Sequence, residues 1–325
     1  MTDLESGVRW AIRKHLPGRD VVDIRDRGVW GRQIVQVVLD GGEVVVIKIS
    51  PRRSGWLEGG ETQELKVARL LAQHGIDVVP PVLAVDGSCE ILPDPYMIQA
   101  YRGGTRLGTL LTQSPGEGSA LYEAVGRLYA GIHAIHNDRD GLWNGTSPDT
   151  PWGAPTEHMG QANIVEGAGQ EAVEAGCLTE RTHARAGALW RAAVPYLLAH
   201  QPSMVHVSPF LWTIYLERTA GAWRVVKLMS VGDFLWWDPA YDVACLRYPP
   251  FGEMPAPWWE GFLSGYGPEP ELKRLLLYAV LQRLMAAMGA FMQPNSPANA
   301  AWMAQARQTL EPTISAMLDQ IEILA

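Results

Sequence analysis

The sequence predicts an α+β fold in which a small antiparallel β-sheet with one helix precedes a larger, mainly helical region. Two observations lead to this prediction. Short runs rich in Val and Ile fill residues 20–50 and recur at 81–101, whereas beyond residue 119 apolar side chains lie three and four positions apart. A chain of 325 residues that is 47% hydrophobic and 19% charged can also bury sizeable cores. We therefore expect two lobes, residues 1–101 and 102–325.

The first lobe is predicted to begin with a helix, which Pro17-Gly18 ends, and to continue as a sheet. Asp40-Gly41-Gly42 separates two β-branched runs, a pattern typical of an antiparallel hairpin. A second helix is expected to end at Gly75. In order, the expected elements are a helix over 4–16, strands over 21–24, 33–39 and 43–49, a helix from 61 to 74, and strands over 81–86 and 95–101.

The second lobe is predicted to be helical with one β-like insertion. Apolar spacing indicates helices over 119–136, roughly 168–200 and 271–292. Residues 145–167 are rich in Gly, Pro, Ser and Thr, which favours a long loop or lid. The insertion covers residues 204–232 and is followed by the string WWDPAYDVACL.

Charge and segment composition exclude several classes of function. A net charge of −8 argues against a nucleic-acid-binding surface, because that affinity depends on many Lys and Arg contacts to phosphate. The acidic N-terminal segment does not resemble a signal peptide, and Gln282 and Arg283 interrupt the most apolar helix, so we expect no membrane partner and a cytoplasmic protein. Five lysines among 27 basic residues indicate a GC-rich bacterial source.

The three cysteines are widely separated. Cys89, Cys177 and Cys245 show no CxxC spacing, so neither a zinc site nor a disulfide framework is indicated. We expect reduced, buried thiols and no metal ligands.

Four strings resemble the aminoglycoside phosphotransferase family, whose members have a bilobal, protein-kinase-like fold. They are VVVIKIS, QELKVARLLAQHG, VGRLYAGIHAIH and WWDPAYDVACL, and the similarity extends from about residue 20 to residue 285. The resemblance implies that Lys48 is the lysine that binds phosphate and that Glu64 is its partner. It also implies that the linker between the lobes would present backbone groups of Gln99 and Tyr101 to an adenine.

Lys48 stands in the middle of an apolar strand, where an unpaired charge would be costly. An ion pair with Glu64 on the following helix would remove that cost. The alternative is that Lys48 lies on the solvent face of an edge strand. His133 and His136 are expected to cap the end of their helix, because cations are favoured there.

The resemblance places the family's His-Gly-Asp-x-x-x-x-Asn loop on HVSPFLWT, residues 206–213. His206 matches, but Ser208 stands at the position of the catalytic base and Thr213 at that of the magnesium-binding Asn. The second magnesium-binding Asp would lie eight residues before Asp238, at Ser230. Catalytic and metal-binding residues are therefore predicted to be absent from the segments within 204–244.

The same loop is unusually apolar. Trp212 stands where the family has Gly, and Pro209, Phe210 and Leu211 precede it. We predict an aromatic wall at the former catalytic cleft, formed by Phe210 and Trp212 with Trp236 and Trp237 nearby in the sequence. The alternative is that these rings belong to the core.

Two further strings leave alternatives open. Asp233 in GDFLW superficially resembles a kinase magnesium motif; it could replace one metal ligand, or it could be an ordinary turn residue after Gly232. The turn from Gly28 to Gly31 could cover a phosphate or simply connect two strands.

These observations predict a catalytically degenerate member of the family, a pseudokinase. It would bind a peptide, a small molecule or another protein, for example an active enzyme of a bacterial biosynthetic pathway, as a scaffold or substrate-presenting subunit. It would need no cofactor, and any ATP would bind weakly and without magnesium. The alternative is an active phosphotransferase with a rearranged site, or a transferase of other chemistry that uses the same cleft.

Overall fold

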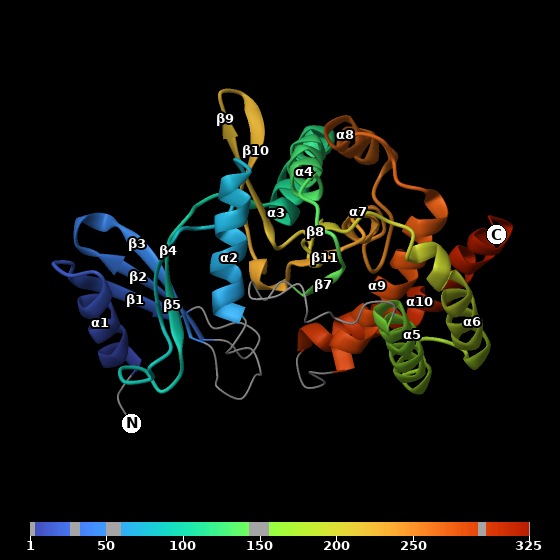
Figure 1. Ribbon diagram of the computed structural model, residues 1–325, viewed down its shortest axis with the longest axis horizontal. Coiled ribbons are helices and arrows are strands. Elements are labelled where there is room, and N and C mark those ends of the chain that lie inside the picture. Colours follow the sequence, from blue (N-terminus) through green and yellow to red (C-terminus); the bar gives the residue numbers. More distant parts are fainter. Residues whose placement is uncertain (1–3, 27–32, 50–59, 143–155, 292–296, 325) are drawn as a thin grey trace.

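The computed structural model describes residues 4–26, 33–49, 60–142, 156–291 and 297–324. The chain has two parts that lie side by side (Figure 1). One is a β-sheet with a helix, and the other is mainly helical. The predicted α+β architecture is confirmed.

A five-stranded antiparallel sheet forms the core of the first lobe. Its strands follow the order β1-β2-β3-β5-β4, and α1 packs on one face. Alternate residues of β2 and β3, including Val35 and Ile47, are fully buried against Val8 and Ile12 of α1. The bounds are α1 (Leu4–His15), β1 (Val21–Asp26), β2 (Gln33–Leu39), β3 (Val44–Ile49), β4 (Val82–Asp86) and β5 (Tyr96–Ala100).

Helix α2 (Gly60–Gln73) lies between the sheet and the second lobe (Figure 1). Its residues Val67 and Leu71 are fully buried in the larger core, which the second lobe supplies. The helix stops before Gly75, whose φ of +74° is a left-handed conformation that favours glycine. One helix therefore contacts both lobes, and this positions the charged residues described below.

The β-like insertion of the second lobe belongs to two small three-stranded sheets, which also include strands at residues 105–106, 141–142 and 235–237. The first has the order β10-β9-β6, and the second has the order β7-β11-β8. The strands are β6 (Thr105–Arg106), β7 (Gly141–Leu142), β8 (Ser203–Val205), β9 (Ile214–Thr219), β10 (Ala222–Leu228) and β11 (Leu235–Trp237), with the 3-10 helix η4 (Val231–Asp233) before β11.

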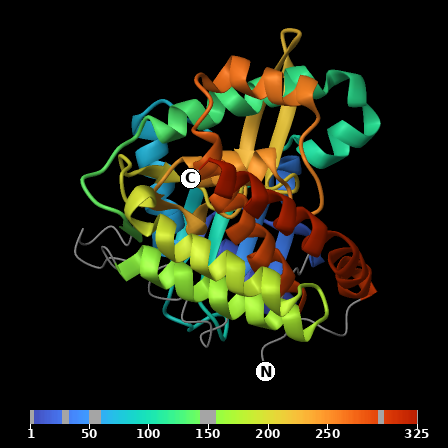
Figure 2. The same ribbon diagram turned by 90° about the vertical axis from the view of Figure 1, so that its right-hand side faces the viewer.

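Helices complete this lobe. They are α3 (Leu107–Gln113), α4 (Gly118–His133), α5 (Thr156–Glu174), α6 (Glu180–Leu197), α7 (Ala240–Arg247), α8 (Ala256–Tyr266), α9 (Leu272–Phe291) and α10 (Pro297–Ile323). Figure 2 shows α5 and α6 lying side by side. Helices α4 and α8 approach very closely, because a Cβ on Gly126 would lie 2.2 Å from the backbone oxygen of Phe262.

Several sequence-based boundaries differ from the structure. The loop expected over 145–167 is wrong from residue 156 onward, where α5 begins; its earlier part lies outside the described residues. The helix expected over 168–200 is two helices, because Gly176 takes a φ of +69° and Thr179 caps α6. Helix α4 ends at His133 instead of residue 136.

Within the described residues, no helix is long and apolar enough to cross a membrane. The lobe boundary at residue 101 stays a prediction. The glycine turn at residues 28–31 lies outside the described residues.

Candidate functional site

Lys48 and Glu64 form the predicted ion pair where the sheet faces α2. The Lys48 Nζ donates to Glu64 Oε1 at 2.6 Å, and the Gln99 side-chain amide donates to the same oxygen at 2.8 Å. The Lys48 side chain is 19% exposed, whereas that of Glu64 is only 4% exposed. Since the three residues belong to β3, α2 and β5, their contacts tie the helix to the sheet. The ion pair is confirmed, and its role towards a phosphate stays a prediction.

The backbone groups of the segment that joins the lobes form hydrogen bonds within the protein. The N–H of Tyr101 donates to the Val44 carbonyl at 3.0 Å, and Gln99 pairs with strands on both sides. The Lys227 Nζ donates to the Arg102 carbonyl at 2.8 Å and lies 3.8 Å from the centre of the Tyr215 ring. Contact of Gln99 and Tyr101 with a nucleotide stays a prediction.

Burial lowers the pKa of Lys227 to about 8, with help from the positive charges of Arg106, Arg102 and Lys48. Several positive charges therefore lie close together at this end of the site, and Lys48 is the one that pairs with Glu64.

His206 begins the loop of residues 206–213 and is fully buried. The Tyr129 hydroxyl donates to His206 Nδ1 at 2.7 Å, while His206 Nε2 donates to the Met229 carbonyl at 2.8 Å. Burial lowers the pKa of this histidine, although the charge of Asp242 opposes the effect. The imidazole is therefore neutral and structural.

The carboxylate of Asp242 sets the backbone of this loop. It accepts hydrogen bonds from the N–H groups of His206 and Val207 at 2.7 and 2.8 Å, and it is fully buried. Val207 has a φ of +67°, which is uncommon for a β-branched residue and costs of the order of 1–3 kcal/mol. Asp242 thus stabilises a strained turn immediately before Ser208.

The hydroxyl of Thr213 is engaged within the loop. Its Oγ1 accepts from the Phe210 N–H at 3.0 Å and lies 2.7 Å from the Ser208 carbonyl oxygen, to which it donates. Thr213 is only 3% exposed. At the position that the resemblance assigns to a metal ligand, the side chain therefore fixes the loop instead.

Ser208 and Asp233 contact each other through their side chains. The Ser208 Oγ donates to Asp233 Oδ2 at 3.1 Å. Ser230 has a φ of +59°, and η4 follows it, with the Asp233 N–H donating to the Ser230 carbonyl at 3.0 Å. Asp233 therefore lies in a turn and faces Ser208, and its role as a metal ligand stays a prediction.

Trp212 and Phe210 line a cavity of about 320 Å³ beside this loop. Their rings stack at 4.6 Å, and half of the Trp212 side chain is exposed, so Trp212 is not a core residue. Trp237 is buried in the core and Trp236 packs against it, and neither lines the cavity. The predicted aromatic wall therefore contains Phe210 and Trp212 but not the other two tryptophans.

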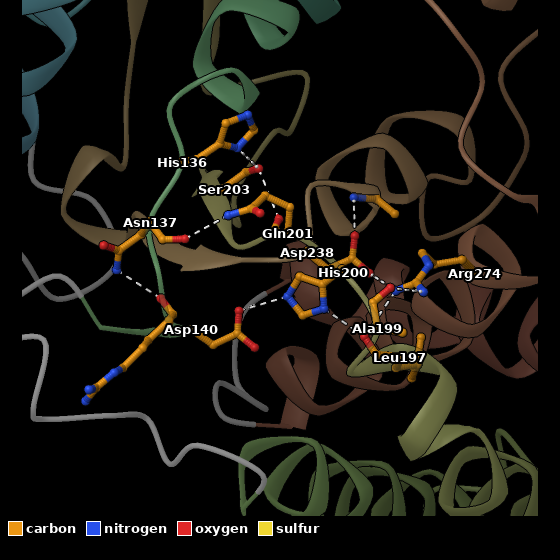
Figure 3. A network of polar contacts seen from close by, with 12 residues as sticks. His136, Asn137, Asp140, Leu197, Ala199, His200, Gln201, Ser203, Asp238 and Arg274 are labelled. Atoms are coloured by element: carbon orange, nitrogen blue, oxygen red, sulfur yellow. Dashed lines mark hydrogen bonds and ion pairs between the residues drawn. The ribbon is translucent and has the colours of Figure 1, made fainter.

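Asp238 belongs to a structural network around the end of α6 (Figure 3). It accepts from Arg274 at 2.5 Å and from the Tyr278 hydroxyl at 2.9 Å. Arg274 also donates to backbone carbonyls at the end of α6, including those of Leu197 and Ala199, which have no partner inside the helix. The string WWDPAYD thus stabilises the fold through both of its aspartates.

The prediction that His133 and His136 cap their helix is wrong. His133 Nε2 lies 3.2 Å from Asp242 Oδ2, and its Nδ1 lies 2.9 Å from the Tyr266 hydroxyl. His136 contacts the Ser203 hydroxyl at 3.0 Å (Figure 3). Both side chains bind groups on other elements, which a sequence pattern within one helix cannot indicate.

Cys177 and Cys245 are buried, and burial raises the pKa of each thiol. Cys89 is partly exposed, so its predicted burial is wrong. In the part of the chain that the structure describes, no three His, Cys, Asp or Glu side chains gather as a metal site.

A sheet that holds a Lys–Glu pair, a helix shared between lobes and a helical lobe that contains the 206–213 loop together define a bilobal, kinase-like fold. The model of the phosphotransferase enzyme family, APH, matches residues 24–278, which is most of the chain. The chain therefore belongs to the phosphotransferase enzyme family.

Solved structures with the same fold include an aminoglycoside phosphotransferase APH(4)-Ia mutant, with a TM-score of 0.68 and 16% identity over 96% of this chain and 98% of that one. A putative aminoglycoside phosphotransferase from Ralstonia eutropha JMP134 also has a TM-score of 0.68, at 15% identity and with 98% of each chain covered. A GDP and kanamycin complex of an APH(2″) enzyme has a TM-score of 0.63, at 12% identity and with 99% of each chain covered. The search of curated proteins gives no match.

Proposed function

We propose that this protein is a catalytically inactive member of its family that binds a ligand instead of transferring phosphate. One observation carries the proposal. The positions that the sequence resemblance assigns to the base and the two magnesium ligands hold Ser208, Thr213 and Ser230, and the Thr213 hydroxyl is bound within its own loop.

These residues do not fit a magnesium site. Mg²⁺ requires near-octahedral oxygen ligands and is usually anchored by carboxylates together with substrate phosphates. Neutral hydroxyls cannot offset the repulsion within a triphosphate, and loss of one preorganised electrostatic group commonly costs about 10²–10³ in rate. Replacement of three such groups should leave no measurable transfer.

The remaining features suit a binding protein. The Lys48–Glu64 pair and the Asp242 network maintain the shape of the lobes, and an apolar cavity lies beside the former catalytic loop. We assign the protein the role of a scaffold or substrate-presenting subunit in a bacterial biosynthetic pathway. It would act in the cytoplasm on a peptide, a small molecule or an active pathway enzyme. ATP is not required for this role.

The direct test is incubation with [γ-³²P]ATP and Mg²⁺, with release of phosphate and labelling of kanamycin or a peptide library as readouts. The matched control is the triple variant Ser208→Asp, Thr213→Asn and Ser230→Asp. We expect no release above the buffer rate from the natural chain. Turnover by the natural chain that its Lys48→Met variant loses would contradict the proposal.

The hydrogen bond between Ser208 and Asp233 favours one second candidate, a phosphotransferase whose carboxylate comes from Asp233. Asp233 Oδ2 lies 3.1 Å from the Ser208 hydroxyl, so this carboxylate stands beside the position that the resemblance assigns to the base. Asp233→Asn separates the candidates, because it would abolish turnover in this enzyme and would change nothing in an inactive protein.

A further inference from the structure

We propose that the cavity beside the former catalytic loop is a binding site for a small, uncharged aromatic ligand. The cavity lies between α3, residues 209–212, the segment that joins α7 to α8, and the start of α8. The inference deepens the proposed function, on which it rests, by naming the chemical class of the ligand.

Six aromatic rings belong to the described lining. They are the side chains of Tyr122, Phe210, Trp212, Phe251, Trp258 and Trp302. Rings supply large apolar contact areas at little conformational entropy, and aromatic pairs prefer stacked or edge-to-face geometry. A planar aromatic ligand can use both modes against these walls.

The charge of the lining favours a neutral ligand. Among the described residues that line the cavity, Glu253 is the only charged one. Its carboxylate lies 2.5 Å from Arg247 Nη2, which neutralises it. A cation that entered would lose hydration and meet no carboxylate other than the paired Glu253, and an anion would lose hydration and meet no basic side chain of the described lining, so desolvation disfavours both.

The volume sets the size of the ligand. The cavity measures about 320 Å³. A dry protein cavity of about 150 Å³ holds benzene, so this one accommodates about two fused rings. It lies at the lower end of the roughly 300–1,000 Å³ that is usual for small-molecule sites.

Contacts around the cavity hold its walls in place. Tyr122 stacks on Trp258 at 5.8 Å, and Phe251 meets the edge of Trp302 at 4.4 Å. On the loop, the Thr213 hydroxyl accepts from the Phe210 backbone N–H and so fixes the residue whose ring stacks on Trp212. A preformed wall lowers the entropy cost of binding. The side chain at the former metal position thus supports the new site.

Trp212 gives the second indication of a ligand. Half of its side chain is exposed at the rim of the cavity, although its apolar ring faces no stabilising core there. Tryptophan is strongly enriched among residues that dominate binding energy. A ligand in the cavity would cover this ring.

The experiment uses two probes of equal shape, 2-naphthalenemethanol and 2-naphthylmethylamine, titrated into the full chain by calorimetry at pH 7.5. The amine is a cation at this pH and the alcohol is neutral. We expect the alcohol to bind at least tenfold more tightly than the amine, and kanamycin not to bind. Equal or tighter binding of the amine, or no saturable binding of the alcohol, would overturn the inference.

Two variants locate the site. Trp212→Ala should weaken binding of the alcohol at least fivefold, whereas Trp10→Ala should leave it unchanged, because Trp10 lines a separate cavity on α1. Weaker binding of the alcohol by Trp10→Ala together with unchanged binding by Trp212→Ala would also overturn the inference. Adding [γ-³²P]ATP and Mg²⁺ to the protein with bound alcohol distinguishes the two proposals. Phosphorylation of the alcohol hydroxyl would refute the proposal of an inactive protein and leave the cavity site standing. If the alcohol does not bind and no phosphate is transferred, only the cavity site is refuted.

Discussion

Two sets of positions in the second lobe differ in what they retain. Asp238 and Asp242 are buried carboxylates that hold a helix end and the backbone of the 206–213 loop. The positions that the resemblance assigns to the base and the magnesium ligands carry only the hydroxyls of Ser208, Thr213 and Ser230. The comparison teaches that the carboxylates of this region stabilise the fold, whereas the positions that the resemblance assigns to catalysis carry neutral hydroxyls.

The first lobe extends this comparison. Lys48 and Glu64 form a close ion pair that ties α2 to the sheet through Gln99. Such a pair stabilises the arrangement of the lobes whether or not a phosphate binds. Its presence alone therefore does not indicate catalysis.

The largest effect is expected for Asp242→Ala, which tests the structural set. Removing this carboxylate leaves two buried backbone N–H groups and His133 without an acceptor. We expect the free energy of unfolding to fall by about 3–5 kcal/mol, measured by urea denaturation. The matched control Ser230→Ala should cost less than about 1 kcal/mol. Similar costs at the two positions would remove the distinction between the two sets.

A smaller effect is expected at the ion pair. Glu64→Ala leaves a mostly buried Lys48 ammonium and the Gln99 amide unpaired, which should cost about 2–3 kcal/mol in the free energy of unfolding. A double-mutant cycle with Lys48→Met isolates the pair, and we expect a coupling of about 1 kcal/mol or more. A coupling of zero would show that the pair contributes nothing to stability.

Two histidines should give stability opposite dependences on pH. Burial lowers the pKa of His206 below the unfolded value of 6.5, so its contribution is present above pH 6.5 and is lost as the pH falls. Burial opposes protonation of His200 as well, but the hydrogen bond to Asp140 and the charge of Asp238 raise its pKa (Figure 3). Its contribution is present below pH 6.5 and is lost as the pH rises through the raised value.

Urea denaturation of His206→Gln and His200→Gln between pH 5 and pH 8 measures both signs. Each variant should change the slope of stability with pH by up to about 1.4 kcal/mol per pH unit, in opposite directions. Slopes that change in the same direction would contradict the assigned protonation states.

The smallest effect on stability is expected for Trp212→Ala. Half of this side chain is exposed, so its removal should cost less than about 1 kcal/mol in thermal or urea unfolding. Trp190→Ala is the comparison, since Trp190 is 1% exposed and its loss should cost about 3–5 kcal/mol. A cost for Trp212→Ala close to that for Trp190→Ala would make Trp212 a structural residue and not a ligand contact.

The sequence predicted the first lobe well because its signals are local. Alternation in β2 and β3 and the turn at Asp40-Gly41-Gly42 identify a hairpin, and the unpaired charge of Lys48 required a partner, which is Glu64. The start of α5 was missed because residues 145–167 are rich in glycine, proline, serine and threonine, which are typical of loops. Helix α8 was missed because Gly261 and Gly265 are unfavourable in a helix, although they permit its contact with α4.

The site was predicted only in part, because its contacts connect distant segments. The sequence places Ser208, Thr213 and Ser230 at the positions that the resemblance assigns to the base and the metal ligands, and the loss of catalysis stays a prediction. The roles of His133 and Asp242 could not be predicted from the sequence, since 109 residues separate them. The cavity also combines α3, the loop and α10, so no spacing rule indicates it.

Binding of ATP with and without Mg²⁺, measured by calorimetry on the natural chain, tests the central claim most directly. The triple variant Ser208→Asp, Thr213→Asn and Ser230→Asp is the positive control, and Ser230 already has a left-handed conformation that Asp tolerates. We predict that Mg²⁺ changes the Kd of the natural chain by less than about threefold and strengthens binding by the triple variant more than tenfold, about 1.4 kcal/mol. Binding by the natural chain that is tenfold tighter with Mg²⁺ would contradict the account.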